Sequence, residues 1–284
     1  MPKAACAEGP GLWYQDRGPR RAPTVLALHG VTGTHRTWRD LARLADQGCL
    51  RLLAPDLPGH GRTGGCDPVV MTMSRTAEAL LGLPLPSRFH LIGYSMGARL
   101  ALHVARRAPE RIASLVLESG SPGLAATGER EDRRVADERW ARMLEREGIR
   151  VFQGRWSAQP LFESQRRLPA AVRRRIARER IGQNPRGLAA SLRGAGTGSQ
   201  ESLWEDLDRL RMPTLLVVGD LDQKFQGVGL AMVRRLENAR LVTMANCGHA
   251  PHLEAPRSFW SEVAAFWRAL SEPLDIAAPE SGND

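Results

Sequence analysis

Several features that mark common protein classes are missing from this chain. Its four cysteines are scattered and include no Cys-x-x-Cys pair, which argues against a disulfide framework and for a reducing compartment. Residues 1–10 hold no apolar run of signal-peptide length, and no stretch approaches the roughly 20 consecutive apolar residues that span a membrane. We therefore expect a cytoplasmic protein without a membrane span.

Aromatic residues and lysine are also scarce. Aromatics make up 5% of the chain, and the 40 basic residues are arginines apart from Lys3 and Lys224, so arginine supplies the net charge of +9. Such a charge fits nucleic acid, an anionic membrane or an acidic small substrate, and it fits an arginine-rich proteome equally well. Surfaces that bind nucleic acid interleave aromatics with basic runs, and the sequence has no such stripe. We expect a small anionic substrate and no nucleic-acid partner; no pattern indicates an oligomeric state.

The hydrophobic pattern predicts an α/β fold. The chain is 42% hydrophobic and 25% charged, and its 284 residues suit one large domain. Short apolar runs alternate with longer helical patterns, which is typical of a mostly parallel sheet flanked by helices. The predicted strands are Leu12–Gln15, Thr24–Leu28, Leu50–Ala54, Phe89–Gly93, Ser114–Leu117, Thr214–Val218 and Arg240–Met244. The predicted helices beside them are Arg36–Asp46, Ser74–Gly82, Met96–Arg107, Gly229–Glu237 and Pro256–Leu270.

One long segment breaks this alternation. Between residues 122 and 209 the pattern predicts helices and no strand, at Arg130–Glu147, Pro169–Ile181 and Pro185–Arg193. The segment carries 18 arginines against 13 acidic residues, more than half of the net positive charge. Because it lies between two predicted strands, it is an insertion and not a tandem domain. We predict a core at 1–121 and 210–271, a helical lid at 122–209 and a disordered tail at 272–284.

Ser95 carries the strongest chemical signal. The predicted strand that starts at Phe89 runs into Gly93-Tyr94-Ser95-Met96-Gly97, and a helical pattern follows. Gly-x-Ser-x-Gly between a strand and a helix is the nucleophile elbow of the α/β-hydrolase fold, a strained turn that exposes the serine hydroxyl above the sheet edge. The pentapeptide alone is a weak signal, and its strand–turn–helix context makes it specific. We predict an α/β-hydrolase fold in which Ser95 is the catalytic serine.

A reactive serine needs a histidine to take its proton and a carboxylate to orient that histidine. His249 follows the last predicted strand directly after a glycine, and His252 is its competitor. Asp222 lies in the loop beyond the preceding strand, and Asp220 is the alternative. The chain order serine, aspartate, histidine is that of the fold. We predict the triad Ser95, Asp222 and His249.

An oxyanion hole needs two backbone N–H groups. Met96 follows the serine and should supply one, and Val31, directly after the strand Thr24–Leu28, should supply the other. Cys247 lies close to His249 and His252, but no fourth ligand lies nearby in the sequence, so we expect no metal site.

Further motifs resemble one family within this fold, the 2-succinyl-6-hydroxy-2,4-cyclohexadiene-1-carboxylate synthases of menaquinone biosynthesis. The resemblance covers about residues 24–267, and the motifs in the predicted lid make it specific. The motifs are Gly93-Tyr94-Ser95-Met96-Gly97-Ala98-Arg99, Glu118-Ser119-Gly120-Ser121-Pro122-Gly123-Leu124, the run from Gln183 to Arg193, Gly219-Asp220-Leu221-Asp222-Gln223-Lys224-Phe225 and the run from Cys247 to Glu254.

The resemblance implies a carbon–oxygen lyase that needs no metal or organic cofactor. Its substrate would be a cyclohexene ring bearing a carboxylate, a succinyl chain and an enolpyruvyl ether. The enzyme would remove a ring proton and expel pyruvate to leave a conjugated diene. The serine, activated by the histidine, would act as the base without forming an acyl-enzyme.

A substrate with three carboxylates calls for fixed cations, preferably arginines that bind carboxylate through two hydrogen bonds. Arg99 lies one helical turn after the serine and so close to it. The resemblance implies substrate-binding roles for Tyr94, Arg99, Arg133, Trp156 and Arg180. Arg134 is the alternative to Arg133, and Arg178 is the alternative to Arg180.

Two other functions fit the same residues. A serine hydrolase of an ester, a thioester or a vinylogous carbon–carbon bond would use the same triad and would form an acyl-enzyme. A non-catalytic binding protein on this fold would have a degraded triad, and Ser95, Asp222 and His249 are all present. The arginines favour a polyanionic substrate over a lipid ester.

Overall fold

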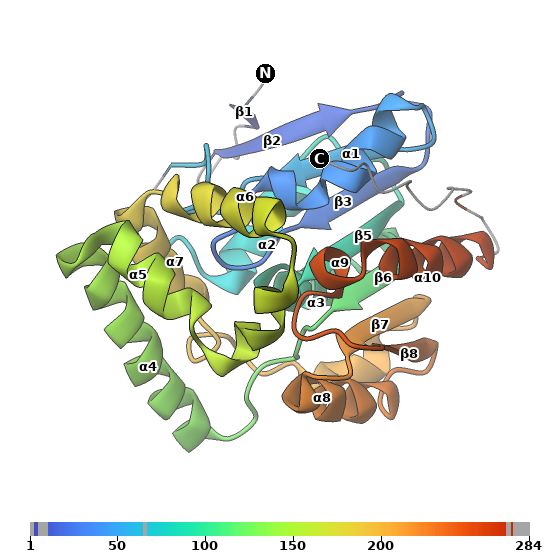
Figure 1. The fold of residues 1–284 in the computed structure, drawn as a ribbon. Coiled ribbons are helices and arrows are strands. Elements are labelled where there is room, and N and C mark those ends of the chain that lie inside the picture. The colour runs from blue at the N-terminus through green and yellow to red at the C-terminus, as the bar shows by residue number, and fades with distance from the viewer. Residues whose placement is uncertain (1–2, 5–10, 65–66, 271–273, 275–284) are drawn as a thin grey trace.

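The computed structural model describes residues 3–4, 11–64, 67–270 and 274. Eight strands form one sheet in the order β1-β2-β4-β3-β5-β6-β7-β8 (Figure 1). The first two strands pair antiparallel with their neighbours, and β3 to β8 pair in parallel. The strands are β1 (Lys3–Ala4), β2 (Leu12–Arg17), β3 (Thr24–Leu28), β4 (Arg51–Pro55), β5 (Phe89–Tyr94), β6 (Ile112–Glu118), β7 (Thr214–Gly219) and β8 (Ala239–Met244). The mostly parallel sheet predicted from the sequence is confirmed.

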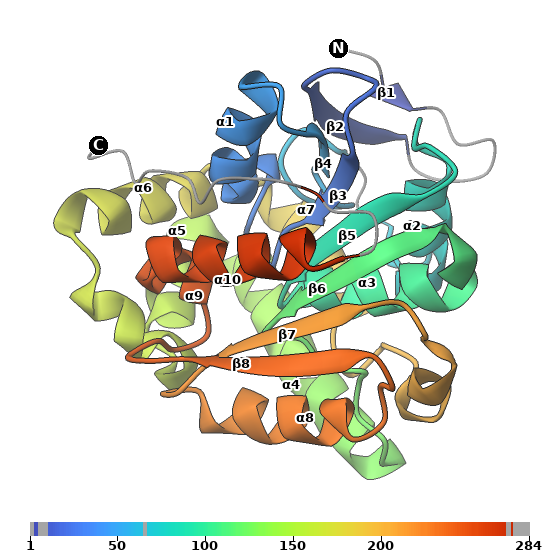
Figure 2. The ribbon, with the colours of Figure 1, turned by 90° about the vertical axis from the view of Figure 1, so that its right-hand side faces the viewer.

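Helices cover both faces of this sheet, which is why its central strands are almost entirely apolar. One face packs against α1 (Arg39–Asp46) and α10 (Pro256–Arg268), with Trp38, Phe259 and Trp260 in that layer of the core. The other face packs against α2 (Met73–Leu81), α3 (Met96–Arg107) and α8 (Gln223–Val233). Figure 2 shows α10 lying along the near face of the sheet.

Residues 122–209, which we call the lid, lie between β6 and β7 and contain helices without a strand (Figure 1). Its helices are α4 (Thr127–Arg146), α5 (Gly148–Ser157), η3 (Pro160–Arg167), α6 (Ala170–Ile181), α7 (Pro185–Ala195) and η4 (Trp204–Arg209). Phe152, Trp156, Phe162 and Leu188 are buried together in a small core of the lid. The division of the chain into a core at 1–121 and 210–271 with this insertion stays a prediction. The expected tail at 272–284 lies outside the described residues apart from Leu274.

Several predicted helix boundaries were wrong. Helix α8 begins at Gln223 and not at Gly229, because the Asp222 carboxylate caps it by accepting from the Phe225 N–H. The predicted helix at 36–46 is divided into η1 (His35–Trp38) and α1. The sequence analysis did not anticipate α5, η3, η4, the short helices η2 (Pro109–Arg111) and α9 (Pro251–Glu254), or β1.

Candidate active site

Ser95 occupies the sharp turn between β5 and α3. Its backbone has φ +51° and ψ −110°, a combination that costs a non-glycine residue of the order of 1–3 kcal/mol. The flanking glycines make this turn sterically feasible. A Cβ atom on Gly97 would overlap the Leu28 carbonyl, and a Cβ on Gly93 would overlap the Gly97 carbonyl. The turn is further held by the Ser95 N–H, which donates to the Glu118 carbonyl at 2.8 Å.

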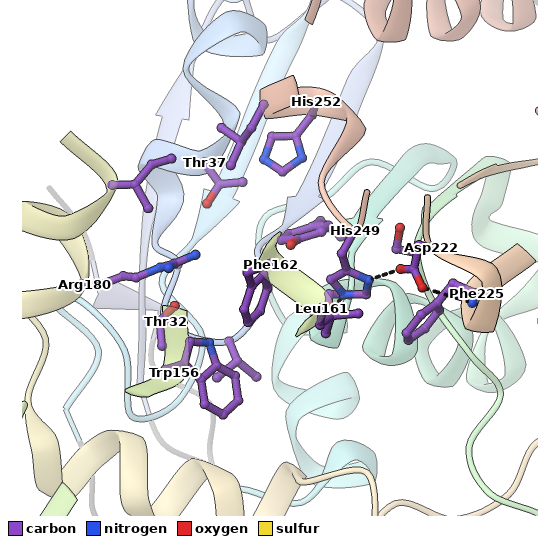
Figure 3. Close-up of a pocket in the computed structure, with 18 of the residues that line it drawn as sticks. Thr32, Thr37, Trp156, Leu161, Phe162, Arg180, Asp222, Phe225, His249 and His252 are labelled. Atoms are coloured by element: carbon purple, nitrogen blue, oxygen red, sulfur yellow. Dashed lines mark hydrogen bonds and ion pairs between the residues drawn. The ribbon is translucent and has the colours of Figure 1, made fainter. Parts of the chain in front are cut away.

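The three predicted triad residues meet at the end of the parallel strands. His249 Nδ1 lies 2.7 Å from Asp222 Oδ2 (Figure 3), and His249 Nε2 lies 3.0 Å from Ser95 Oγ. Because a carboxylate only accepts hydrogen bonds, Nδ1 carries the imidazole proton and Nε2 accepts from the serine hydroxyl. His249 and Asp222 are 1% and 6% exposed, so water does not weaken their contact. This chain of hydrogen bonds can draw a proton from the serine toward the histidine.

The two alternative triad residues, His252 and Asp220, make other contacts. His252 is directed at Glu118, whose carboxylate accepts from the His252 backbone N–H at 2.8 Å and from its Nδ1 at 2.9 Å. Asp220 is exposed, and its carboxylate accepts from the Cys247 N–H at 3.1 Å. Neither contacts Ser95, so the geometry favours His249 and Asp222.

The two predicted oxyanion donors flank the serine. Met96 is the first residue of α3, and the first N–H groups of a helix have no partner within it. Val31 lies in the loop after β3 and lines the cavity next to Ser95. The lid residue Gln183 fixes that loop, since its amide nitrogen donates to the carbonyls of Thr32 at 3.2 Å and Gly33 at 3.0 Å.

A cavity of about 1010 Å³ opens above Ser95 and beneath the lid. Aromatic rings surround the imidazole of His249: the ring centres of Phe225, Tyr94 and Phe162 lie 4.6, 5.6 and 6.1 Å from its own. Figure 3 shows Phe225 and Phe162 near this imidazole. Burial and then the charge of Glu118 raise the pKa of Tyr94, so its phenol stays neutral. Trp156 lines the same cavity, and its buried indole N–H has no hydrogen-bond partner among the described residues.

Three predicted arginines also line this cavity. Arg99, on the same helix as the serine, is 7% exposed, and burial followed by the charge of Arg133 lowers its pKa. Arg133 donates from Nε to Asp137 at 2.8 Å. Arg180 extends from α6 toward the cavity (Figure 3), where it donates to Ser157 Oγ at 2.9 Å and burial lowers its pKa.

The two alternative arginines differ from Arg133 and Arg180 in their contacts or in their exposure. Arg134 is not among the residues that line the cavity, and it donates to the Gly198 carbonyl and to Glu131. Arg178 lines the cavity but is exposed, whereas Arg180 lies over the Phe162 ring at 5.4 Å from its centre. The geometry therefore favours Arg133 and Arg180 as the arginines that face a bound ligand.

Two carboxylates that shape the site were not singled out from the sequence. Glu118, fully buried at the end of β6, holds His252. Glu254 accepts from the N–H groups of Gly248 at 2.8 Å and Ala250 at 3.3 Å, and so holds the loop on both sides of His249. Their positions in the sequence could have indicated them, because the end of a parallel strand and the loop that carries His249 both border the site.

The described residues contain no group of three or more His, Cys, Asp or Glu side chains placed to hold a metal ion. In the same part of the chain, no helix is long and apolar enough to cross a membrane.

Comparison with known proteins agrees with this architecture. Residues 23–256 match the family model described as alpha/beta hydrolase fold. The chain is thus an alpha/beta hydrolase fold protein with a serine, a histidine and an aspartate in contact at its strand ends.

Individual relatives narrow the assignment. The 2-succinyl-6-hydroxy-2,4-cyclohexadiene-1-carboxylate synthase of Salmonella agona (strain SL483) is 32% identical over 256 residues, which cover 88% of this chain and 96% of the relative. A Bacillus subtilis (strain 168) protein that carries the same name provisionally is 39% identical over 260 residues, or 90% of this chain and 94% of the relative. The chain belongs to the 2-succinyl-6-hydroxy-2,4-cyclohexadiene-1-carboxylate synthase family.

Solved structures are similar as well. MenH from S. aureus is 29% identical with a TM-score of 0.81, and the match covers 90% of this chain and 97% of that one. A thermophilic esterase from Thermogutta terrifontis, solved with malate bound, is 27% identical with a TM-score of 0.78, covering 94% of this chain and 97% of that one.

Proposed function

We propose that this protein is a lyase of menaquinone biosynthesis. It eliminates pyruvate from 2-succinyl-5-enolpyruvyl-6-hydroxy-3-cyclohexene-1-carboxylate and forms 2-succinyl-6-hydroxy-2,4-cyclohexadiene-1-carboxylate. The relatives that share most of its length carry the name of this reaction. One observation of its own carries the proposal: the Ser95–His249 pair opens into a cavity lined by Arg99, Arg133 and Arg180.

The charge of the cavity suits the substrate. The substrate has three carboxylates, and these arginines lie around the reactive serine. Only Arg133 among the three pairs with a carboxylate, that of Asp137, within the described residues. Arginine binds carboxylate through a fixed pair of parallel N–H donors, so the cavity can hold the substrate by its ends and present the ring to Ser95.

The structures of substrate and product define the bonds that change. Forming a 2,4-diene from a 3-ene requires loss of the proton on ring carbon 2 and cleavage of the carbon 5–oxygen bond. The electron pair of the broken C–H bond forms the new 2,3 double bond, and the ring double bond moves to the 4,5 position. The electron pair of the carbon 5–oxygen bond leaves with enolpyruvate, which takes up a proton on its methylene carbon to become pyruvate and so balances the proton lost from carbon 2. Carbon 2 carries the succinyl ketone, so negative charge develops on that ketone oxygen as the proton leaves.

The triad and the oxyanion donors meet these demands. The Ser95 oxygen, its proton shared with His249, removes the proton from carbon 2, and Asp222 stabilises the charged imidazole; general base catalysis of this kind contributes about 10²- to 10⁴-fold. The N–H groups of Val31 and Met96 stabilise the developing enolate oxygen, worth about 10²- to 10³-fold for each donor. Trp156 of the lid and Tyr94 at the end of β5 border the ring from two sides and keep water away from it.

The decisive experiment measures pyruvate and diene together. Purified protein is mixed with the enolpyruvyl substrate, pyruvate is followed through lactate dehydrogenase and NADH, and the conjugated diene is followed by its ultraviolet absorbance. Elimination yields the two in a one-to-one ratio. Release of pyruvate without diene would instead be hydrolysis of the enol ether, and no release would refute the proposal.

The same triad geometry keeps a serine hydrolase as the second candidate. A hydrolase of an ester, a thioester or a vinylogous carbon–carbon bond passes through an acyl-enzyme, which gives a burst of product with an activated ester. Elimination needs no covalent intermediate. A stoichiometric burst that exceeds the rate of pyruvate release would favour the hydrolase.

A further inference from the structure

The hydrogen-bond partners of Arg99 are both uncharged. Its Nη1 donates to Gln200 Oε1 at 2.8 Å and its Nη2 donates to the Ala195 carbonyl at 3.1 Å. The side chain is nevertheless buried, with 7% of its surface exposed. Burial of a guanidinium is unfavourable, and burial followed by the charge of Arg133 lowers the pKa of this arginine, although the charge of the Asp137 carboxylate partly opposes the shift. The fold therefore maintains a positive charge beside the serine that its own contacts do not neutralise.

The nearby buried carboxylate, that of Asp137, is hydrogen-bonded to another arginine through one oxygen, while its Oδ2 has no hydrogen-bond partner among the described residues. Asp137 is 2% exposed, and its Oδ1 accepts from Arg133 Nε at 2.8 Å. Two guanidinium groups, those of Arg99 and Arg133, thus share one carboxylate in this part of the cavity. The surplus charge falls on the arginine that is hydrogen-bonded only to neutral groups.

Within the described residues, the side-chain amide of Gln200 has one hydrogen-bond partner, the guanidinium of Arg99. It is 2% exposed, follows α7 in the chain, and its backbone N–H donates to the Gly196 carbonyl at 3.1 Å. Since arginine only donates hydrogen bonds, the amide oxygen of Gln200 must face it, which leaves the amide nitrogen buried and without a partner. Gln200 is not among the residues that line the cavity, whereas Arg99, to which it is hydrogen-bonded, is one of them.

We propose that Gln200 is a positioning residue that holds the Arg99 guanidinium toward the cavity and, being a neutral acceptor, leaves its charge free for a carboxylate of the substrate. A glutamate has nearly the same shape and would hold the arginine equally well, but it would neutralise it. The choice of an amide at this position is therefore a determinant of specificity for anionic ligands. This inference rests on the proposed function for the identity of the substrate.

The test is Gln200→Glu, which changes charge and almost nothing else. We expect KM to rise about tenfold to a hundredfold, because the substrate loses one charge-assisted hydrogen bond, while kcat stays near that of the unmodified protein. The melting temperature should stay the same or rise, because the buried arginine gains a counter-charge. Gln47→Glu, the same substitution at the exposed end of α1, is the matched control and should change neither KM nor kcat.

A second variant and a second ligand keep the test independent. Gln200→Leu removes the acceptor without adding charge, and we expect it to raise KM by less than Gln200→Glu does. Succinate, a simple dicarboxylate, is titrated against each variant by tryptophan fluorescence, and its dissociation constant should rise at least tenfold in Gln200→Glu. Because succinate binding needs no turnover, a failure of the proposed lyase reaction is distinguishable from a failure of this inference.

Three results would overturn the role of Gln200. They are unchanged binding of both substrate and succinate by Gln200→Glu, a parallel fall of kcat and melting temperature in that variant, or its failure to fold. The last two would mean that Gln200 is a structural residue, since the positioning role requires a stable ion pair with Arg99.

Discussion

Replacing Asp222 by asparagine separates the catalytic role of this residue from its structural one. Asp222 uses its two oxygens differently: Oδ2 contacts His249 Nδ1 at 2.7 Å, and Oδ1 caps α8 by accepting from the Phe225 N–H at 3.3 Å. If the asparagine oxygen retains the cap, its NH₂ group faces the imidazole. Nδ1 must then accept a hydrogen bond, and the imidazole proton moves to Nε2, which faces Ser95 and can no longer take its proton.

The two roles predict different magnitudes. Loss of the proton acceptor should lower kcat about 10³- to 10⁴-fold, or about 4–5.5 kcal/mol of transition-state stabilisation. Asparagine is as good a helix cap as aspartate, so the free energy of unfolding of Asp222→Asn should change by less than about 1 kcal/mol, whereas Asp222→Ala should lose about 1 kcal/mol more with the cap.

Pyruvate release at saturating substrate measures the first quantity, and urea denaturation followed by circular dichroism measures the second. Asp220→Asn is the matched control, because among the described residues that side chain accepts one hydrogen bond, from the Cys247 N–H, and an asparagine oxygen can do the same. A kcat for Asp222→Asn within about tenfold of the unmodified protein, or a larger loss in Asp220→Asn, would refute the assignment of the triad acid.

Three further predictions follow from the described contacts. Arg180→Gln should raise KM about tenfold to a hundredfold by losing a charge-assisted contact to a carboxylate, while Arg178→Gln, on an exposed part of the same helix, should not; equal effects would contradict the assignment. Burial lowers the pKa of His103 to about 4, so below about pH 6.5 this histidine takes up a proton in the unfolded chain and not in the folded one. Between pH 7 and pH 5 this difference should cost about 2 kcal/mol of unfolding free energy, a loss that His103→Leu should not show. Identical pH dependence of the two proteins in urea titrations would contradict this. Gly97→Ala should yield little folded protein, because its methyl group overlaps the Leu28 carbonyl; a soluble variant with an unchanged melting temperature would be inconsistent with the elbow geometry.

The sequence predicted the triad well because its reactive residues directly follow recognisable strands. The apolar runs located the parallel strands, and each triad residue follows the end of one of them, so their meeting at one edge of the sheet could be expected. The choice of His249 over His252 came from its position directly after Gly248, since both histidines fit the chain order. The reason for it became visible only when the buried Glu118 carboxylate was found on His252.

The lid was less predictable for physical reasons. Gly148 has φ +80° and turns the chain from α4 directly into α5, so two helices follow each other without a polar loop to announce the boundary. Arginines are spread over all faces of these helices, and the sequence does not say which face meets the core. Arg133 and Arg134 are adjacent, yet one lines the cavity and the other bonds the Gly198 carbonyl.

Gln200 illustrates the same limit of sequence patterns. It belongs to no motif, and its neighbours in the chain are small or charged residues typical of a surface loop. Its importance depends on a contact with Arg99, about a hundred residues away, that only the folded chain creates.

The most direct measurement is the rate of pyruvate release by Ser95→Ala at saturating enolpyruvyl substrate. If the Ser95 oxygen removes the ring proton through His249, kcat falls by about 10³-fold or more while the affinity for substrate, which the arginines provide, is retained. A kcat within about tenfold of the unmodified protein would show that another group is the base.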